Sequence, residues 1–207
     1  ERTCLALRIE REREHLRDGA GRRYLLKFDP KSNPEMASAA DVIGSKFFYD
    51  LGYNTPENYI VHFERSQLAL DEKSEIRNPS GSKRHMDEQD LRDALVKVPR
   101  DRDGRYRALA SLYIPGEPIG PFRYYGMRKD DPNDIVPHQT RRDLRGLYVF
   151  AAWLNHTDTK SINSLDSLVD EGGVKYIKHF LIDFGAILGS DSFEAKSPRA
   201  GNVFLFD

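Results

Sequence analysis

Several polar side chains with the capacity for chemistry lie close together in the stretch NHTDTKSIN, residues 155–163, directly after the apolar run LYVFAAWL. The stretch contains four such side chains: His156, Asp158, Lys160 and Asn163. A carboxylate can accept a proton, an ammonium group can neutralise anionic charge, and an amide oxygen can bind a hard cation. Loops of this composition often only contact solvent. The question is therefore whether this one is an ordinary polar loop or a catalytic loop for phosphoryl transfer.

Two further features lie in defined places relative to this loop. The tripeptide Asp-Phe-Gly, residues 183–185, follows it after two strand-like segments, SLDSLV and VKYIKHFLI, which a DEGG turn joins into a hairpin. Lys27 lies near the end of the apolar segment RYLLKF, which is typical of a strand. A lone Asp-Phe-Gly is a weak signal, but the ordered conjunction of loop, hairpin and tripeptide is a stronger one.

Two long helices are predicted to position these segments. The first, 32–52, has a capping-box pattern at Ser32 and Glu35, an apolar stripe with helical periodicity, and a glycine at its C-terminal end. The second, 139–154, leads directly into the NHTDTKSIN loop. The charged stretch 64–107 is predicted to be a solvated excursion that contains one short helix. The other expected elements are strands at 3–9, 23–28, 58–63 and 108–114, a turn at 18–21 and a short helix at 87–97.

The order of lysine strand, loop, hairpin and Asp-Phe-Gly resembles the protein-kinase-like superfamily, whose catalytic loop reads His-Arg-Asp-x-Lys-x-x-Asn. The resemblance implies that Asp158 accepts the proton of an acceptor hydroxyl and that Lys160 lies near the moving γ-phosphoryl group. It also implies that Asn163 and Asp183 bind Mg²⁺, or Mn²⁺, and that Lys27 holds the α- and β-phosphates of ATP.

The resemblance further implies an acidic partner for the lysine on the first helix and a hinge that binds adenine. Glu35 and Asp41 are the two candidates for the acid. Asp41 is preferred, because Glu35 is assigned to the capping box and because small residues near Asp41 would let the helix approach the sheet. Aspartate is one methylene shorter than the usual glutamate. Backbone groups of Leu112, Tyr113 and Ile114, at the end of the ALASLYI strand, are expected to bind adenine.

The chain also departs from ordinary protein kinases. Thr157 stands where many of them have arginine, so control by a phosphorylated activation loop loses its usual anchor. No convincing glycine-rich loop is found before Lys27, which leaves the location of the nucleotide-covering loop open, and SPRAGN stands where Ala-Pro-Glu is expected. These departures favour the atypical branch of the superfamily, which includes HipA-like and phosphoinositide-kinase-like proteins. The segment FFYDLGYNTPENYIV resembles the HipA-like pattern, in which a helix closes on glycine and a Pro-Glu segment leads to the next strand.

The resemblance predicts an α+β, two-lobed protein-kinase-like fold with an ATP cleft between the lobes. The antiparallel-sheet N-lobe is expected at 1–115, and a mainly helical, incomplete C-lobe at 116–207, with the connector PGEPIGPF at the boundary. The expected function is transfer of the ATP γ-phosphoryl group to a hydroxyl acceptor. The alternatives are a pseudokinase that binds nucleotide or serves as a scaffold without turnover, and an unrelated α+β domain in which the motif match is accidental.

The composition of the chain argues against several classes of binding partner. The 207 residues carry a net charge of −1, which gives no overall attraction to nucleic acid or to membranes. No apolar run approaches the length of a membrane span. The single cysteine, Cys4, excludes an internal disulfide framework and a cysteine-based zinc site. A protein or small-molecule acceptor is favoured over a lipid, because no basic amphipathic helix is found. No targeting segment is visible, which favours a soluble, cytoplasmic protein and leaves the compartment open.

Overall fold

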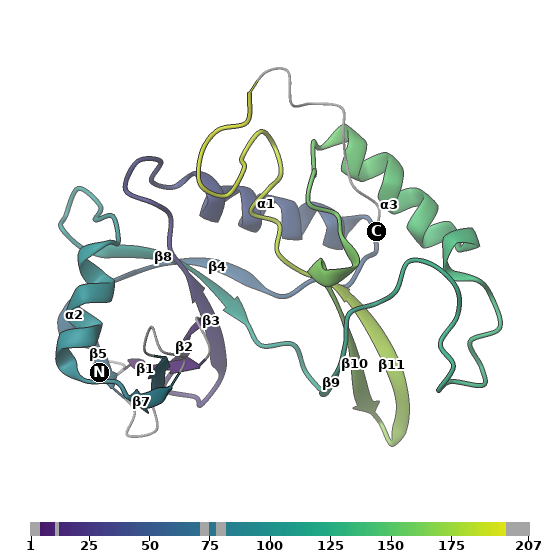
Figure 1. Ribbon diagram of the computed structural model, residues 1–207, viewed down its shortest axis with the longest axis horizontal. Coiled ribbons are helices and arrows are strands. Elements are labelled where there is room, and N and C mark those ends of the chain that lie inside the picture. The colour runs from purple at the N-terminus through teal and green to yellow at the C-terminus, as the bar shows by residue number, and fades with distance from the viewer. Residues whose placement is uncertain (1–4, 11–12, 71–74, 78–81, 198–207) are drawn as a thin grey trace.

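The computed structural model describes residues 5–10, 13–70, 75–77 and 82–197 (Figure 1). These residues form an α+β protein, as expected from the sequence, with helices and small, mostly antiparallel sheets. Cys4 lies outside them. The α-helices are α1 (Met36–Asp50), α2 (Glu88–Val96) and α3 (Arg142–Trp153), and the short 3-10 helices are Arg65–Gln67, His138–Thr140 and Ser161–Asn163. The strands are β1 (Leu5–Glu10), β2 (Arg13–Arg17), β3 (Arg23–Lys27), β4 (Asn58–Phe63), β5 (Leu68–Leu70), β6 (Glu75–Arg77), β7 (Lys83–His85), β8 (Tyr106–Leu112), β9 (Glu117–Gly120), β10 (Ser164–Glu171) and β11 (Val174–Leu181).

A six-stranded sheet, with the order β4-β8-β3-β2-β1-β5, forms the first part of the molecule. Its neighbours pair antiparallel except for β1 and β5, which are parallel. Strand β3 lies inside the sheet, and its last residue, Lys27, pairs with Leu109 of β8. The predicted strand at 58–63 is confirmed as β4. The turn at 18–21 joins β2 to β3, and β2 itself was not predicted from the sequence.

The charged stretch 64–107 is not merely a solvated excursion. Its helix α2 follows the N-cap Asp87, whose side chain accepts hydrogen bonds from the amides of Gln89 and Asp90. Leu91 and Leu95 on one face of α2 are buried in the core of the six-stranded sheet. The prediction failed because a two-turn helix with only one apolar stripe has many charged positions, and its average composition hides the buried face.

A second core joins α1, α3 and the segment after β11. It contains Phe48 of α1, Leu147 of α3, and Phe184 and Ile187 of the C-terminal segment. Figure 1 shows α1 running between the six-stranded sheet and α3, so that one helix contacts both parts of the molecule. The segments on either side of the candidate loop are therefore packed on a common element.

The second half is not mainly helical within the described residues 116–197. Helix α3 is the α-helix of that region, and β9, β10 and β11 form a three-stranded antiparallel sheet. The expected hairpin is confirmed as β10 and β11, which turn at Gly172 and Gly173 with φ of 64° and 83°. Positive φ is accessible to glycine at little steric cost, so this turn favours the hairpin.

The capping box predicted at Ser32 and Glu35 is wrong. Helix α1 begins at Met36, and Glu35 has φ of 69° with no side-chain capping bond. The amide of Ser38 instead donates to Oδ1 of Asp29 at 2.8 Å, and Arg107 holds the other oxygen of Asp29 at 3.1 Å. A carboxylate from the loop after β3 therefore caps the helix through a tertiary contact that the local sequence pattern does not contain.

Within the described residues, no helix has the length and apolar character needed to cross a membrane.

Candidate functional site

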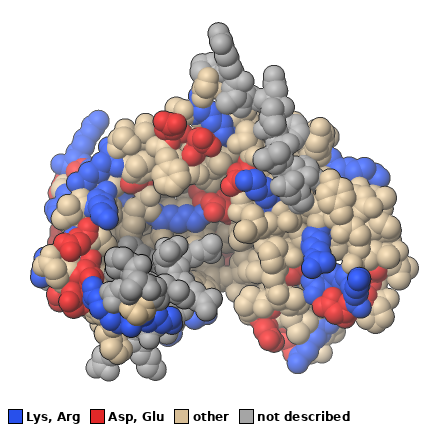
Figure 2. Space-filling model, viewed as in Figure 1, with Lys and Arg blue, Asp and Glu red and all other residues tan. Residues whose placement is uncertain are grey.

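A cavity of about 660 Å³ opens between the six-stranded sheet and the β9–β10–β11 sheet. Figure 2 shows the hollow between these two parts, with basic and acidic side chains meeting inside it. The volume lies in the range of sites that hold a small molecule or cofactor. The predicted site residues that line the cavity are Lys27, Asp41, Leu112, Tyr113, Ile114, Asn163 and Asp183.

Lys27 connects two carboxylates that are far apart in the sequence. Its Nζ lies 2.9 Å from Oδ2 of Asp41 and 2.8 Å from Oδ1 of Asp183. Asn58 of β4 donates from Nδ2 to the other oxygen of Asp41 at 2.8 Å. These four residues are called the Lys27 cluster below. The predicted contact between Lys27 and Asp41 is confirmed, and no sequence signal singled out Asn58.

Burial and charge act in opposite directions in this cluster. Burial alone would lower the pKa of Lys27, but Asp41 and Asp183 outweigh it and raise that pKa, so the ammonium group stays charged. Burial raises the pKa of Asp41, although Lys27 and the backbone amide of Phe184 act in the opposite direction. Asp41 is fully buried, whereas the side chains of Lys27 and Asp183 keep 33% and 47% of their exposure. The cluster is therefore anchored at Asp41 and accessible at Lys27 and Asp183.

The Asp-Phe-Gly segment has an unusual backbone and a tight packing environment. Asp183 has φ of 64°, a left-handed conformation that is uncommon outside glycine. Phe184 is fully buried and stacks on Phe48 with 5.3 Å between ring centroids. A Cβ atom added at Gly44 of α1 would lie 2.9 Å from Cβ of Phe184. Gly44 thus lets α1 approach the Asp-Phe-Gly segment, while the helix also contacts β4 and β8 of the sheet, as expected. Strained residues persist where their surroundings hold them, often at functional sites.

The NHTDTKSIN loop is tied to this segment through Asn163. The Asn163 side chain donates to the backbone oxygen of Asp158 at 2.8 Å and to its Oδ2 at 2.9 Å. The carbonyl of Asn163 accepts from the amide of Ile182 at 3.0 Å, next to Asp183. Lys160 Nζ lies 3.1 Å from Oδ1 of Asp158, and both side chains are partly exposed. Asp158 and Lys160 do not line the cavity itself, but Asn163 connects Asp158 to its wall.

His156 is a packing residue of this loop. Only 3% of it is exposed, and its ring lies 6.0 Å from that of Phe48 and 5.6 Å from that of Phe184. Burial lowers the pKa of His156 to about 4, although a backbone hydrogen bond with Ala186 acts in the opposite direction. The imidazole is therefore neutral near pH 7.

The expected hinge is arranged differently from the prediction. The amide of Leu112 donates to the carbonyl of Glu57 at 2.8 Å, and the amide of Tyr113 donates to the carbonyl of Arg23 at 2.9 Å. Both amides are thus already paired, and they do not offer donors to adenine. Of the three expected hinge residues, Ile114 is the one whose amide has no hydrogen bond to another backbone group of the described residues. The Arg23 guanidinium lies 4.5 Å from the centre of the Tyr113 ring and forms a cation–π contact at the cavity wall. Sequence reasoning missed Arg23.

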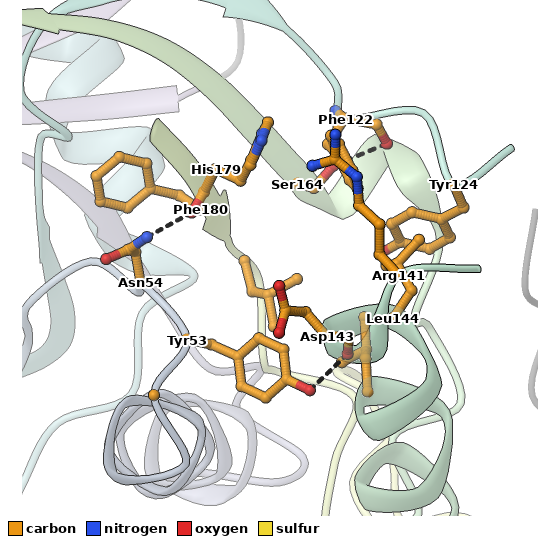
Figure 3. A pocket seen from close by; sticks show the side chains of 13 residues that line it. Tyr53, Asn54, Phe122, Tyr124, Arg141, Asp143, Leu144, Ser164, His179 and Phe180 are labelled. Carbon is orange, nitrogen blue, oxygen red and sulfur yellow. Dashed lines mark hydrogen bonds between the residues drawn. The ribbon is translucent and has the colours of Figure 1, made fainter. Parts of the chain in front are cut away.

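A smaller cavity, of about 140 Å³, lies between α3, the β10–β11 hairpin and the end of α1 (Figure 3). Aromatic and aliphatic side chains form most of its wall. Tyr53 donates from its hydroxyl to the carbonyl of Asp143 at 2.7 Å, and Asn54 donates to the carbonyl of His179 at 2.9 Å. These bonds join the segment after α1 to α3 and to β11, so the cavity lies where structural elements are held together.

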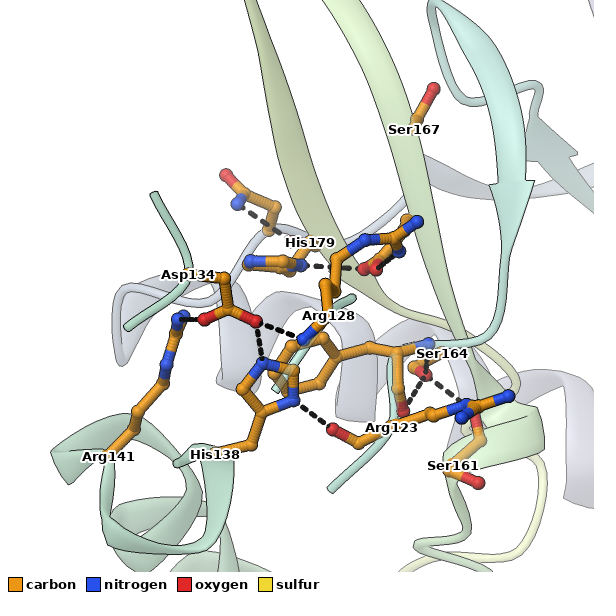
Figure 4. A network of polar contacts seen from close by, with 12 residues as sticks. Arg123, Arg128, Asp134, His138, Arg141, Ser161, Ser164, Ser167 and His179 are labelled. Atoms are coloured by element: carbon orange, nitrogen blue, oxygen red, sulfur yellow. Dashed lines mark hydrogen bonds and ion pairs between the residues drawn. The ribbon is translucent and has the colours of Figure 1, made fainter. Parts of the chain in front are cut away.

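A second group of charged residues lies beside β10 and β11 (Figure 4). Asp134 accepts hydrogen bonds from the amide of Arg128 at 2.6 Å, from Nε2 of His138 at 2.7 Å, and from the Arg141 guanidinium. Arg128 also contacts Asp166 of β10 at 2.8 Å. We call Arg128, Asp134, His138 and Arg141 the Asp134 cluster. It fastens the long loop before α3 to the hairpin.

The predicted metal ligands, Asn163 and Asp183, provide few donor atoms, but their oxygens are of the kind that Mg²⁺ prefers. Within the described part of the chain, no group of three His, Cys, Asp or Glu side chains is placed to hold a metal ion. Asp183 and Asn163 offer one carboxylate and one amide at the cavity wall. Mg²⁺ is often held by one or two carboxylates together with substrate phosphates and water, so this pair fits a metal that arrives with a nucleotide.

Comparison of the chain with protein-family models, with curated proteins and with solved structures finds no match in any of the three. The chemistry of the cavity therefore has to be inferred from its own side chains and their geometry.

Proposed function

We propose that this chain is an atypical ATP-dependent kinase that transfers the γ-phosphoryl group of ATP to a hydroxyl acceptor. The observation that carries the proposal is the Lys27 cluster. A charged lysine at the end of β3 lies between Asp41 of α1 and the Asp-Phe-Gly aspartate, in the wall of a nucleotide-sized cavity. This convergence supports the kinase proposal over a solvated polar loop or an accidental motif match.

The proposal includes a two-lobed, kinase-like arrangement. Residues 1–115 would form the lobe with the six-stranded sheet, and residues 116–207 the lobe with α3, the hairpin and the NHTDTKSIN loop. The cavity lies between the parts that these two ranges contribute. Helix α1 would support the site from the first lobe.

ATP binding would use the accessible side of the Lys27 cluster. The Lys27 ammonium would contact the α- and β-phosphates while Asp41, held by Asn58, fixes its direction. Asn163 and Asp183 would hold Mg²⁺ or Mn²⁺, which neutralises phosphate charge when bound. The base would lie beside Arg23 and Tyr113 and would accept a hydrogen bond from the Ile114 amide.

Proton transfer would use the exposed side of the loop. Asp158 would accept the proton of the acceptor hydroxyl, and Asn163 keeps its carboxylate oriented through the hydrogen bond to Oδ2. Lys160, beside Asp158, would neutralise charge on the moving phosphoryl group. The partial exposure of both side chains leaves room for a protein or small-molecule acceptor. A cytoplasmic location agrees with an ATP-dependent reaction and remains part of the proposal.

A pseudokinase is the second candidate, and one observation favours it. The Leu112 and Tyr113 amides are paired within the protein, which weakens the expected recognition of adenine. A chain with the polar groups for phosphate and a poor base site could bind nucleotide without turnover. The two candidates differ in turnover, not in Mg²⁺-dependent binding.

Calorimetric titration of Mg²⁺-ATP, together with an ATP turnover assay, tests the proposal. Wild type should bind Mg²⁺-ATP and turn it over, by autophosphorylation if no other acceptor is found. Asp183→Asn should weaken binding, because a negative charge beside a divalent cation is lost. Asp158→Asn should bind normally and fail in turnover, because its carboxylate contacts the acceptor rather than the nucleotide.

Each other outcome has a definite meaning. Binding without turnover in the wild type favours the pseudokinase. An equal loss of binding in both variants shows that the roles of Asp158 and Asp183 are misassigned. The absence of Mg²⁺-dependent nucleotide binding in the wild type contradicts both candidates.

A further inference from the structure

The segment after Asp-Phe-Gly folds back on the NHTDTKSIN loop. Ser190 and Ala195 form an isolated antiparallel bridge, which makes residues 190–195 a compact turn. The amide of Leu188 donates to the carbonyl of Leu154 at the end of α3 at 2.9 Å. This segment therefore has a defined conformation against the start of the loop that carries Asp158.

Lys196 closes this fold with two hydrogen bonds. Its Nζ donates to the carbonyl of Asn155 at 2.7 Å and to the carbonyl of Ala186 at 3.0 Å. Asn155 is the first residue of the NHTDTKSIN loop, and its φ of 55° is left-handed. Ala186 directly follows the Asp-Phe-Gly tripeptide. One ammonium group thus bridges the two segments that contain Asp158 and Asp183.

The environment of Lys196 is unusual for a structural lysine. Among the described residues, no carboxylate lies within ion-pair distance of its Nζ, and both of its hydrogen-bond acceptors are backbone carbonyls. Burial lowers the pKa of Lys196, although Asp191 and Asp158 act in the opposite direction. Partial desolvation of a cation costs free energy, which two charge-assisted hydrogen bonds offset. A surface lysine would avoid this cost by pointing into water, so its position is set by the two carbonyls.

We propose that Lys196 is a positioning residue for the proposed phosphoryl transfer, and that it locks the segment after Asp-Phe-Gly to the loop that carries Asp158. The inference rests on the proposed function. It also explains a feature of the sequence, because Thr157 offers no cation that could hold a phosphorylated side chain. Lys196, within the segment itself, takes the place of a contact between arginine and a phosphorylated side chain. The lock therefore forms without phosphorylation.

The Lys196 contact is proposed to set the position of Asp158 relative to Asp183, and not to bind the nucleotide. The Lys27 cluster and the cavity wall do not include Lys196. Loss of the ammonium group should therefore leave Mg²⁺-ATP affinity unchanged and misplace Asp158 relative to Asp183. Misplacement of reacting groups by about 1 Å can lower a rate on the order of a hundred-fold.

The test compares Lys196→Met, which keeps most of the side-chain stem, with Lys196→Arg, which restores a cation and donors. Lys178→Met is the matched control, because Lys178 pairs with Glu171 on the hairpin surface, away from the loop. Three measurements are made on each purified chain: hydrogen exchange of the Leu188 amide, calorimetric binding of Mg²⁺-ATP, and the kcat and KM of turnover.

Lys196→Met should exchange the Leu188 amide at least about tenfold faster and lose at least about tenfold in kcat, with KM for ATP changed less than about twofold. Lys196→Arg should recover much of both losses, and Lys178→Met should match the wild type. Exchange and kcat that stay within about twofold of wild type in Lys196→Met overturn the proposal. So does a kcat loss with unchanged exchange, because the lock would then not be its cause.

The proposed function can fail separately. A wild-type chain that does not turn over ATP contradicts the kinase and, with it, the catalytic role of Lys196. Normal turnover with an unaffected Lys196→Met variant retains the kinase and removes only the lock.

Discussion

The Lys27 cluster and the Asp134 cluster both pair aspartates with basic side chains. They differ in how far those polar groups are buried and hydrogen-bonded within the protein. Asp134 and His138 are 3% and 1% exposed, and Asp134 accepts three hydrogen bonds from the long loop before α3 and from Arg141 next to the start of that helix. Lys27 and Asp183 remain partly open to the 660 Å³ cavity, and they come from segments 156 positions apart. Satisfied polar groups fix a structure, whereas accessible ones are available to a ligand.

The two clusters also differ in how the pKa of their buried aspartate, Asp134 or Asp41, is shifted. Burial would raise the pKa of Asp134, but hydrogen bonds from the Arg128 amide and from His138 lower it below its usual value. Burial raises the pKa of Asp41 in spite of Lys27. Hydrogen bonds therefore outweigh burial at Asp134, whereas burial outweighs them at Asp41.

The largest expected effect is on turnover in the candidate site. Asp158→Asn should lower turnover by about a hundred- to ten-thousand-fold, because a general base is removed. The free energy of unfolding should change by less than about 0.5 kcal/mol, because Asp158 is half-exposed and an asparagine oxygen can still accept from Asn163. Turnover and urea unfolding are measured on the same preparation. A large loss of stability would make Asp158 a structural residue like Asp134.

The second expected effect is on stability in the Asp134 cluster. Asp134→Ala leaves three donors without their acceptor and should lower the free energy of unfolding by about 3–5 kcal/mol. Mg²⁺-ATP affinity, measured by calorimetry at a temperature where the variant is folded, should stay within about twofold. Asp130→Ala, on the surface beside Arg128, is the matched control. A loss of affinity in Asp134→Ala would show that the two clusters are coupled.

The third expected effect is a pH dependence that originates at His156. Its pKa is about 4 in the folded chain and about 6.5 when unfolded, so the unfolded state binds more protons between these values. Stability is therefore fully present above pH 6.5 and is lost as the pH falls toward 4. Between pH 7 and pH 5 the contribution amounts to about 2 kcal/mol.

Urea unfolding of His156→Leu and of the control His85→Gln checks this dependence. The slope of stability against pH between 6.5 and 4 should flatten in His156→Leu and persist in His85→Gln. His85 is exposed, which makes it a suitable reference. An unchanged slope in His156→Leu would place the proton uptake at another group.

The last prediction is that removal of phosphate from the chain has no effect on turnover. Phosphatase treatment should leave turnover unchanged, because Thr157 provides no cation for a phosphorylated side chain after Gly185 and Lys196 already fastens that segment. Turnover before and after treatment is compared, with mass spectrometry to verify removal of phosphate. A loss of activity would show that a phosphate takes part in the site.

Local patterns in the sequence predicted several elements because they depend on neighbouring residues. The hairpin of β10 and β11 follows from apolar strand segments and a Gly-Gly turn, and α3 follows from its helical periodicity. The long helix α1 was predicted for the same reason, although its start was misplaced. The spacing of Asp158, Asn163 and Asp183 was equally visible, since it lies along the chain.

Contacts between distant segments could not be obtained in this way. The choice between Glu35 and Asp41 as the partner of Lys27 rested on a helix cap that the structure places at Asp29 instead. The buried face of α2, the pairing of the Leu112 and Tyr113 amides, and the role of Asn58 all depend on which strands become neighbours.

The sequence by itself therefore determined the kinds of side chain available for chemistry and the local elements that carry them, because hydrophobic periodicity and turn residues act over a few positions. The pairing of Lys27 with Asp41 was expected from the resemblance, but only the tertiary structure decided that Asp183 pairs with the same lysine. It also decided that the hydrogen bonds of Asp134 hold a loop, and that Lys196 donates to the carbonyls of Asn155 and Ala186. The physical reason is that each of these contacts joins residues that become neighbours only when the chain packs, with α1 contacting β4 and β8 on one side and contributing to the second core on the other.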